Sequence, residues 1–226
     1  MNLFIYECDL NLTPEEQMAT DAWLLYQTSI KNAFCFRVYQ MNNTCTFGRS
    51  QKIKSIEKRE LEVEKLVRRP TGGGAVVHGN DVTFALSIPN SSDLFNLKLI
   101  ELYKEIHILF SRVLDNFLID TGLSDKKVGT LPDFCFEFPN QYDLLEQDAG
   151  KKIAGSAIKK SKEGILVQGN IIHELDLEDF LIFSQQEFVS QFSLSLENFS
   201  SQRYRKCCHW ENLCHQFKSP SWNYNL

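Results

Sequence analysis

A glycine-rich stretch between two β-like runs has the composition of a ligand-binding loop. Within LVRRPTGGGAVVHGNDVTF (66–84), three consecutive glycines at 72–74 follow Arg68 and Arg69. Glycine adopts positive φ and has no Cβ, so the backbone N–H groups of such a loop can approach a bound group closely. The two arginines add permanent positive charge beside it. The stretch therefore predicts a site for a carboxylate, a phosphate or an activated acyl group.

Taken alone, the same stretch also fits a glycine-rich hairpin with two solvated arginines, because short motifs of this kind recur by chance. His78 follows the glycines and adds a side chain that can donate, accept or titrate near neutral pH. Two further segments, around Cys135 and Lys152, bear on the choice between these interpretations.

Cys135 lies between two phenylalanines in FCFEFPNQYDLL (134–145). A lone cysteine in an aromatic segment is most often a small buried hydrophobic residue. The functional alternative is a thiolate nucleophile, which a nearby lysine or helix N-terminus has to stabilise. Cys135 is therefore a candidate nucleophile if the fold brings a cation beside it.

Lys152 precedes a run of small residues, IAGSA (153–157). Small residues on a strand let a ligand or another backbone lie close against it. A lysine at that position can direct its ammonium at an acyl carbonyl and stabilise the negative charge that develops on the oxygen. The simpler alternative is a solvated lysine at the end of a strand, which is the usual environment of lysines.

A cluster of cysteine and histidine near the C-terminus could suggest a metal site. It comprises Cys207, Cys208, His209, Cys214 and His215. Zinc needs four ligands at compatible spacing, and adjacent residues do not converge easily on one ion. We therefore expect no metal site in this chain, and a structural role for His107 and His173.

Regular elements must position these candidate residues, and periodicity predicts them along most of the chain. A helix from Thr13 to about Thr28 begins with a capping box and proline at its first turn. Further helices are expected at 55–65, 97–118 and 177–183, and strands at 3–7, 34–39, 45–49, 65–68, 75–78, 81–89 and 164–176. Residues 121–133 are expected to form a loop or hairpin, and 164–176 one strand or two strands bent at Gly169.

This order of elements predicts an α/β (α+β) fold with a mixed β-sheet flanked by helices. The length of 226 residues suits one catalytic domain spanning 1–226, in which about 185–226 forms a less regular C-terminal extension. For that extension we expect two short helices and an irregular aromatic end.

Bulk composition excludes several classes of function. The net charge is −5 without a basic tail, which argues against nucleic acid as an electrostatic partner. No apolar run approaches the roughly 18 residues of a membrane span, and the acidic N-terminus is unlike a secretory signal. The seven cysteines are therefore expected to be reduced thiols, and the protein to be cytoplasmic.

The paired motifs resemble those of the biotin–lipoate protein ligase family, in its lipoate and octanoate branch. In that family an Arg-Arg-x-Ser/Thr-Gly-Gly-x-Ala-Val/Ile-x-His run lines the acyl pocket, and a downstream Lys-Ile/Val-x-Gly-x-Ala run supplies the lysine that contacts the acyl carbonyl. This chain has RRPTGGGAVVH followed by KIAGSA, preceded by QMATDAWLL, RVY and TFGRSQ. The resemblance covers about residues 1–180 and implies the catalytic-domain fold of that family.

The family contains two chemistries. Its lipoate–protein ligases use ATP and Mg to make lipoyl-AMP, whereas its cysteine-type octanoyltransferases hold the acyl group as an enzyme thioester. Residues 135–144, CFEFPNQYDL, are similar to the Cys-Phe-x-x-Pro-Ser-x-Tyr-Glu-Leu run around the transferase nucleophile, and 81–84, DVTF, to a Glu/Asp-Leu-Thr-Tyr run. Gly74 and Asn140 depart from the transferase pattern, and a third glycine is more typical of ligases. The stretch after Phe183 is too short for the accessory domain of many ligases, which favours the transferase.

The resemblance therefore implies an acyltransferase of protein lipoylation, in which Cys135 carries an octanoyl or lipoyl group and Lys152 stabilises the oxyanion. The implied donor is an acyl carrier protein or a lipoyl domain, the acceptor is a lysine of a lipoyl domain, and the thioester route requires no cofactor. An ATP-dependent lipoate ligase and a non-catalytic carrier-binding relative remain the alternatives. The implied substrate-binding residues are Arg68, Arg69, Thr71, Gly72, Gly73, Gly74, Ala75, His78, Asp81, Thr83, Gly155, Ser156 and Ala157.

Overall fold

Two β-sheets form the centre of the molecule. The structure, a computed structural model, describes residues 1–6, 12–127, 133–199 and 207–224. The larger sheet has eight strands in the order β11-β1-β2-β6-β10-β9-β8-β7, and the smaller has three in the order β4-β3-β5. The strands of the larger sheet are β1 (Asn2–Tyr6), β2 (Phe34–Tyr39), β6 (Val82–Pro89), β7 (Thr121–Leu123), β8 (Leu144–Glu146), β9 (Lys152–Ser161), β10 (Gly164–Ile171) and β11 (Ser195–Phe199). Those of the smaller sheet are β3 (Thr44–Phe47), β4 (Lys65–Arg68) and β5 (Val76–His78).

Both sheets are mixed. In the larger one β1 pairs in parallel with β2 and β11, while the pairs from β2 through β6, β10, β9 and β8 to β7 are antiparallel. In the smaller one β3 is parallel to β4 and antiparallel to β5. The predicted mixed sheet flanked by helices is confirmed.

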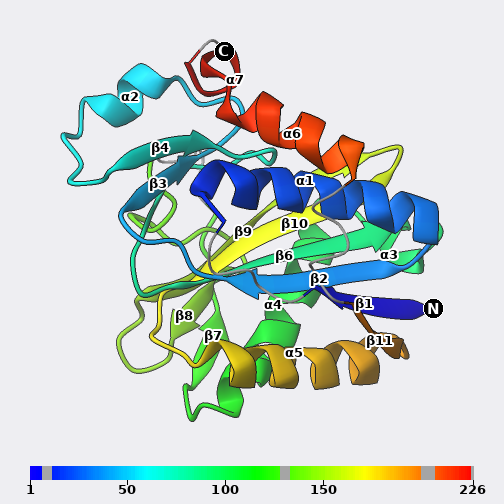
Figure 1. Cartoon of the computed structure of the whole chain (residues 1–226). Coiled ribbons are helices and arrows are strands. Elements are labelled where there is room, and N and C mark those ends of the chain that lie inside the picture. The colour runs from blue at the N-terminus through cyan, green and yellow to red at the C-terminus, as the bar shows by residue number, and fades with distance from the viewer. Residues whose placement is uncertain (7–11, 128–132, 200–206, 225–226) are drawn as a thin grey trace.

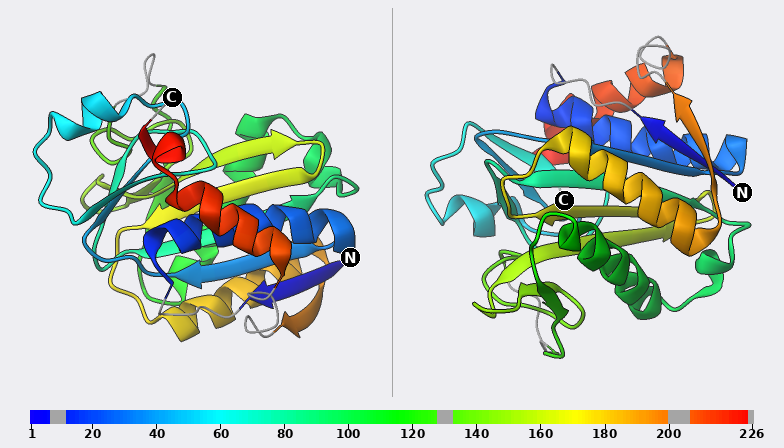
Figure 2. Two further views of the ribbon diagram at one scale, coloured as in Figure 1. Left: turned by 45° about the horizontal axis from the view of Figure 1, so that its top comes forward. Right: turned by 90° about the horizontal axis from the view of Figure 1, so that it is seen from below.

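Helices cover both faces of the larger sheet (Figure 1). On one face lies α1 (Pro14–Lys31), with α6 (Cys208–Lys218) packed on its outer side. On the other face α4 (Leu99–Asp115) and α5 (Leu177–Phe192) lie side by side, as the view from below shows (Figure 2). The shorter helices are α2 (Ile53–Glu57), α3 (Asp93–Asn96) and α7 (Pro220–Tyr224). None of the helices in the described residues is both long and apolar enough to cross a bilayer.

The start of α1 follows from its sequence. The Thr13 side chain accepts from the Glu16 backbone N–H, and the Glu16 carboxylate accepts from the Thr13 N–H at 2.9 Å. This reciprocal capping box satisfies two of the free N–H groups of the first turn. The predicted helix is confirmed, and it extends to Lys31, where Asn32 ends it in the left-handed conformation.

The largest core lies between the sheet and the α4–α5 layer. Leu102, Ile106, Leu109, Phe110 and Val113 recur on α4 at intervals of three and four, and all are buried. Phenylalanines of α5 and of strands β2 and β6 complete this layer. The helix predicted over 97–118 is confirmed with shorter bounds, because residues 97 and 98 have extended backbone and Asn116 is already the C-cap.

Several predicted boundaries were wrong. The helix expected at 55–65 is only α2, because Glu60 adopts positive φ and the chain then runs extended into β4. The strand expected over 164–176 ends at Ile171 and is continuous through Gly169. Helix α5 runs on to Phe192, well beyond the predicted 183, because Phe188 and Phe192 continue its apolar contacts with the core. The 185–226 region also contains β11, which periodicity did not predict.

Candidate functional site

The glycine loop connects β4 to β5 and lies against another turn. Gly73 has φ +87°, a conformation that favours glycine. The Gly73 carbonyl oxygen lies 2.0 Å from the position that a Cβ on Gly48 would occupy. The turn at Gly48 and the glycine loop can therefore pack this closely only because residue 48 has no side chain. A Cβ on Gly73 would in turn lie 3.7 Å from the Sγ of Cys135. The loop backbone is therefore in contact with the candidate nucleophile.

Arg69 is the arginine that faces the site. It is buried and donates to the Thr46 carbonyl and hydroxyl and to the carbonyls of Gly72 and Gly74 at 2.7–3.0 Å. Burial lowers the pKa of Arg69, while the neighbouring Cys135 and Cys45 thiols act in the opposite direction. The guanidinium thus fixes the shape of the loop from inside and keeps a positive charge near Cys135.

Arg68 points the other way, so its predicted contact with the ligand does not match the structure. Its guanidinium donates to the carbonyls of Arg49, Gln51, Trp222 and Asn223 at 2.7–3.1 Å. Alternating side chains of a strand face opposite sides, and Arg68 is the last residue of β4. Its role is to join three backbone segments behind the loop.

His78 belongs to a buried hydrogen-bond network. Its Nδ1 lies 2.9 Å from Asp81 Oδ2, and its Nε2 lies 2.8 Å from the Thr46 hydroxyl. Asn170 donates to Asp81 at 2.5 Å and to the Thr83 hydroxyl at 2.8 Å. Burial raises the pKa of Asp81, but the hydrogen bonds from His78, Gly79 and Asn170 outweigh it and hold that pKa below its usual value.

Thr71 connects the loop to a second buried network. Its hydroxyl donates to Gln168 Oε1 at 2.7 Å, and Gln168 Nε2 donates to Asp21 at 2.5 Å. Asp21 also pairs with Arg37 at 2.8 Å and accepts from Tyr39 at 2.7 Å. Burial is the largest influence on Asp21 and raises its pKa despite these partners. Helix α1 and strands β2 and β10 are thus joined to the loop through polar side chains.

Cys135 and Lys152 meet beside the glycine loop. The Cys135 thiol donates to the Gly74 carbonyl at 3.2 Å, and its backbone N–H donates to the Ala75 carbonyl at 2.8 Å. The Lys152 ammonium donates to the Cys135 carbonyl at 2.7 Å and pairs with Asp143 at 2.7 Å. The structure therefore brings together the three segments whose residue types suggested chemistry.

Small residues after Lys152 let its side chain fold back over the strand. A Cβ on Gly155 would lie 2.7 Å from Lys152 Cε and 2.8 Å from Nζ, so a side chain there would displace the ammonium. Ala157 lies on the same strand, 3.4 Å from where a Cβ on Gly73 would be. The spacing of small residues in KIAGSA has a direct steric reason.

His107 supports the site from α4. Its Nδ1 lies 2.5 Å from the Tyr142 carbonyl and its Nε2 lies 3.0 Å from the Ser156 hydroxyl. Burial lowers the pKa of His107 to about 4, so the ring is neutral at neutral pH. A carbonyl can only accept, so Nδ1 carries the proton and Nε2 accepts from Ser156. The predicted structural role of His107 matches these contacts.

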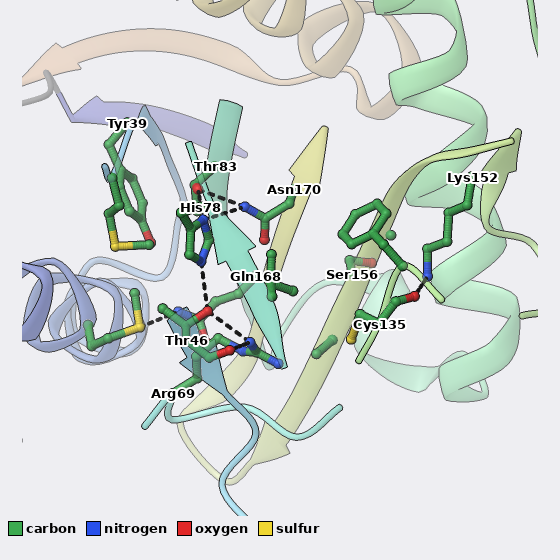
Figure 3. Close-up of a pocket in the computed structure, with 16 residues that line it drawn as sticks. Tyr39, Thr46, Arg69, His78, Thr83, Cys135, Lys152, Ser156, Gln168 and Asn170 are labelled. Atoms are coloured by element: carbon green, nitrogen blue, oxygen red, sulfur yellow. Dashed lines mark hydrogen bonds between the residues drawn. The ribbon is translucent and has the colours of Figure 1, made fainter. Parts of the chain in front are cut away.

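Two cavities meet at Cys135, Lys152 and Ser156. The inner cavity extends from these three residues to the His78 network, and Figure 3 shows the two groups on opposite sides. Its remaining described lining consists of Met18, Tyr39, Met41, Thr46, Arg69, Val76, Thr83, Phe136, Gly155, Ala157, Gln168 and Asn170. The outer cavity is mostly apolar and is lined by Gly73, Gly74, Leu99, Ile100, Tyr103, Phe138, Asn140, Gln141, Asp143 and Ile158 besides the shared three.

Most predicted binding residues line one of the cavities, four others lie directly behind the lining, and Arg68 points away from both cavities. Thr71, Gly72, Ala75 and Asp81 contact lining residues through the hydrogen bonds given above and are not lining residues themselves. The sequence indicated no site role for Tyr103, His107, Gln168 or Asn170, whose only signal was a polar side chain within a predicted element. Asp143 belongs to the 135–144 run that resembles the transferases, but it was given no role of its own.

The C-terminal cysteine and histidine residues lie on α6 or, for Cys207, at its N-cap, and none lines either cavity. Cys214 is buried, Cys208 is exposed, and His209 stacks on Tyr26 of α1. Within the ranges that the structure describes, no group of three or more histidine, cysteine or acidic residues could hold a metal ion. Six cysteines lie in those ranges, and all six are free thiols.

Comparison with known proteins identifies relatives of this chain. The family model described as the lipoyl protein ligase A/B catalytic domain matches residues 13–201. The octanoyltransferase LipM of Staphylococcus epidermidis is 32% identical over 153 residues, which are 64% of this chain and 54% of that protein. LipM of Bacillus subtilis is 28% identical over 208 residues, 83% of this chain and 73% of that protein. The chain spans about half the length of several of these relatives.

Solved structures share the whole fold at low identity. Protein Ta0514 from T. acidophilum has a TM-score of 0.76 at 15% identity, covering 100% of this chain and 99% of that one. A lipoate-protein ligase A bound with ATP has a TM-score of 0.71 at 15% identity over 98% and 97% of the two chains. A bi-partite lipoate protein ligase from Thermoplasma acidophilum, studied with its E2 lipoyl domain, reaches 0.68 at 15% identity over 98% and 95%. The predicted catalytic-domain fold is confirmed by these similarities.

Proposed function

The chain belongs to the family of lipoyl protein ligase A/B catalytic domains, and from this membership we propose that it is an acyltransferase of protein lipoylation. It moves an octanoyl or lipoyl group from a thioester donor onto a lysine of a lipoyl domain, and Cys135 carries the acyl group between them. The observation that carries the proposal is that Cys135 and Lys152 lie in contact where two cavities meet.

The named relatives support the proposed route of the acyl group and its proposed acceptor. The homologues named octanoyltransferase LipM support a thioester route. A lipoate protein ligase studied with its E2 lipoyl domain supports a lipoyl domain as the acceptor. The donor is then an acyl carrier protein, which presents the acyl group as a thioester, or a second lipoyl domain, which presents it as an amide on a lysine arm and leaves as the lysine amine with the Cys135 proton.

The proposed reaction has two steps that share one oxyanion site. The Cys135 sulfur attacks the thioester carbonyl of the donor, the bond from that carbonyl to the donor sulfur breaks, and the donor leaves as a thiol with the Cys135 proton. The acceptor lysine amine then attacks the Cys135 thioester, forms the amide and returns a proton to the sulfur. In both steps the Lys152 ammonium and the loop backbone at Gly73 and Gly74 stabilise the negative oxygen.

The inner cavity is the proposed acyl slot. Its apolar lining includes Met18, Met41 and Val76, and it begins at Cys135. Each buried CH₂ contributes about 0.8 kcal/mol, so the length of this cavity selects the chain length. The substrate-binding residues that we propose are Arg69, Gly73, Gly74, His78, Thr83, Gly155, Ser156 and Ala157, with Thr71, Gly72, Ala75 and Asp81 supporting them from behind.

ATP-dependent ligation is the second candidate, since an ATP-bound ligase shares this fold. The described lining of the outer cavity does not fit a triphosphate with its metal ion. Lys152 is the one cation in that lining. Phosphate and Mg²⁺ sites need several cations, N–H groups or free carboxylate oxygens. This lining favours the arm of a thioester donor over a nucleotide.

Intact mass spectrometry tests the proposal directly. The protein is incubated with an octanoyl-thioester carrier and compared with Cys135→Ala and with Cys208→Ala, which removes an exposed cysteine outside both cavities. We expect an octanoyl adduct on the wild type and on Cys208→Ala, and none on Cys135→Ala. Addition of a lipoyl domain should then discharge the adduct.

Two other results would support the alternatives. If Cys135→Ala acylates a lipoyl domain from free lipoate and ATP at the wild-type rate, the protein is a ligase and the thiol is incidental. If the wild type binds the carrier but forms neither an adduct nor an acylated acceptor, it is a non-catalytic carrier-binding relative.

A further inference from the structure

Asp143 is an ionisable residue of the 135–144 run for which the sequence suggested no role of its own, and it lies at the centre of the site. Its side chain is 1% exposed, and three donors converge on its two oxygens. Oδ2 accepts from the Lys152 ammonium at 2.7 Å and from the Asn140 backbone N–H at 2.5 Å. Oδ1 accepts from the Tyr103 hydroxyl. A carboxylate with this many donors is fixed in one orientation.

From this arrangement we infer that Asp143 is the positioning residue that holds Lys152 as an ammonium directed at Cys135, with Tyr103 fixing Asp143 in turn. The inference deepens the proposed function and rests on it. Asp143 Oδ2 accepts one N–H of Lys152 at 2.7 Å, and the Cys135 carbonyl accepts another at 2.7 Å. These two contacts fix the position of the ammonium beside Cys135, where it can stabilise an oxyanion.

The hydrogen bonds of Lys152 leave room for a substrate. Its side chain is 7% exposed, and its acceptors among the described residues are Asp143 and the Cys135 carbonyl. The ring of Phe136 covers it at 4.9 Å from the centroid. An ammonium has three N–H groups, so one is left to donate to an acyl oxygen next to the Cys135 sulfur.

The ionisable groups around Lys152 and Asp143 have protonation states that are compatible with an ion pair between the two. Burial, followed by the nearby Asp143 charge, raises the pKa of Tyr103 well above its usual value, so the phenol keeps its proton and can donate. His107, which approaches from α4, is neutral because burial lowers its pKa to about 4. On the other side, Arg69 interacts with the Cys135 thiol. Asp143 is therefore the one negative charge among these neighbours of Lys152.

The backbone before Asp143 is held in an uncommon conformation. Tyr142 has φ +68°, which non-glycine residues rarely adopt. Its N–H donates to the Ser124 carbonyl at 2.7 Å, and its carbonyl accepts from His107. Strained residues of this kind persist where the surroundings over-determine them, and they cluster at functional sites. The turn directs Asp143 toward β9, where Lys152 begins the strand.

The test compares Asp143→Asn and Tyr103→Phe with Asp148→Asn, which removes an exposed carboxylate from the turn between β8 and β9. The rate of adduct formation on Cys135 is measured by intact mass. For Asp143→Asn we expect a loss of about 100-fold in this rate, because the ammonium is no longer held in place. Tyr103→Phe should show a smaller loss, and Asp148→Asn none. Asp143→Glu should recover part of the rate.

A second measurement does not depend on turnover. Nitrogen NMR of protein with labelled lysine side chains records the Lys152 signal at one pH, assigned with Lys152→Arg, in the wild type and in Asp143→Asn. We expect the Lys152 signal to shift or broaden in the variant, because the ammonium loses the carboxylate that fixes its position. Identical Lys152 signals, or wild-type rates in folded Asp143→Asn, would overturn the inference. An absence of any adduct on the wild type would instead remove the proposed function, and the NMR comparison would still test the ion pair.

Discussion

At the scale of single residues, Gly155 determines where the Lys152 ammonium can lie. The Lys152 side chain folds over the strand into space that a Cβ on Gly155 would occupy, at 2.7–2.8 Å from its last two atoms. Contacts below 3 Å force one partner to move, and the flexible side chain moves more easily than the backbone. A substitution at this position therefore shifts a charge and leaves the strand in place.

Gly155→Ala should reduce acyl transfer by about 100-fold, because displacement of a catalytic group by about 1 Å has costs of that order. Its thermal stability should change little, since alanine is better suited to a strand than glycine. Gly79→Ala is the matched control, because a Cβ there meets nothing within 4 Å. The measurement compares the steady-state rates of both variants with an octanoyl carrier, and melting curves compare their stability. Equal activity in the two variants would contradict this steric reason for glycine.

The residues that could be predicted from the sequence are those whose neighbours in the chain belong to the same site. Arg69 and His78 flank the glycines, and Lys152 precedes its own small residues. Tyr103 reaches the site only because α4 packs beside β9, so nothing local indicates it, whereas Asp143 shares the 135–144 run with Cys135 but its contact with Lys152 depends on the fold. Arg68 and Arg69 looked equivalent in the sequence. In the structure Arg68 binds backbone carbonyls behind the loop and Arg69 lines the site, because neighbouring residues of an extended chain point to opposite sides.

At the scale of elements, α4 carries a histidine whose environment makes the helix sensitive to pH. His107 is 1% exposed, and burial lowers its pKa from 6.5 to about 4. Between these values the unfolded chain binds a proton at this residue that the folded chain does not. The stabilisation is therefore complete above about pH 6.5 and is lost as the pH falls toward 4.

His107→Gln should flatten this dependence. Over that pH range the wild type should lose up to about 3 kcal/mol of stability that the variant does not lose. Urea unfolding at pH 7 and at pH 4.5 measures the difference, and the slopes with urea concentration check that both proteins unfold alike. Parallel pH dependence in the two proteins would show that His107 is protonated in the folded state.

Elements with strong local signals were predictable, and weakly marked ones were not. The capping box of α1 and the three-and-four spacing of α4 indicated both helices, because local hydrogen bonding and one-sided burial decide them. Strand β11 was missed since it depends on pairing with β1, far away in the chain. The helix predicted over the charged segment 55–65 was too long. Its composition favours a helix, but the chain leaves the helix after Glu57 and runs extended into β4.

At the scale of the whole molecule, the C-terminal helices are tied to the loop that forms the site. Asn223 of α7 accepts the Arg68 N–H with its side chain at 2.9 Å and the Arg68 guanidinium with its carbonyl at 3.1 Å. Trp222 Nε1 donates to the Arg68 carbonyl at 3.0 Å. The extension expected from about residue 185 therefore continues the core of the domain that we propose for 1–226.

Asn223→Ala should destabilise the fold by about 1–3 kcal/mol, because it leaves the buried Arg68 N–H without its acceptor. Ser221→Ala is the control on the same helix, since that side chain is exposed. Denaturant unfolding of both variants measures the difference. A loss in Asn223→Ala no larger than in the control would mean that α7 is not part of the cooperative unit.

The fold as a whole was predictable because hydrophobic patterns define a sheet with helices on both faces. The division into two sheets was not predictable, since the pattern of a single strand does not specify which other strand it pairs with. That division creates the inner cavity, which lies between residues of both sheets. Its position depends on packing between elements that are distant in the sequence.

The meeting of both cavities at Cys135 constrains the order in which substrates visit the enzyme. On the proposed route, the donor arm and the acceptor lysine both need the outer cavity to reach the same sulfur atom. They must therefore use it in turn, and the donor product must leave before the acceptor binds. Initial rates measured against both substrates should give parallel double-reciprocal lines, the signature of ping-pong kinetics. Intersecting lines would mean that both carriers are bound at once.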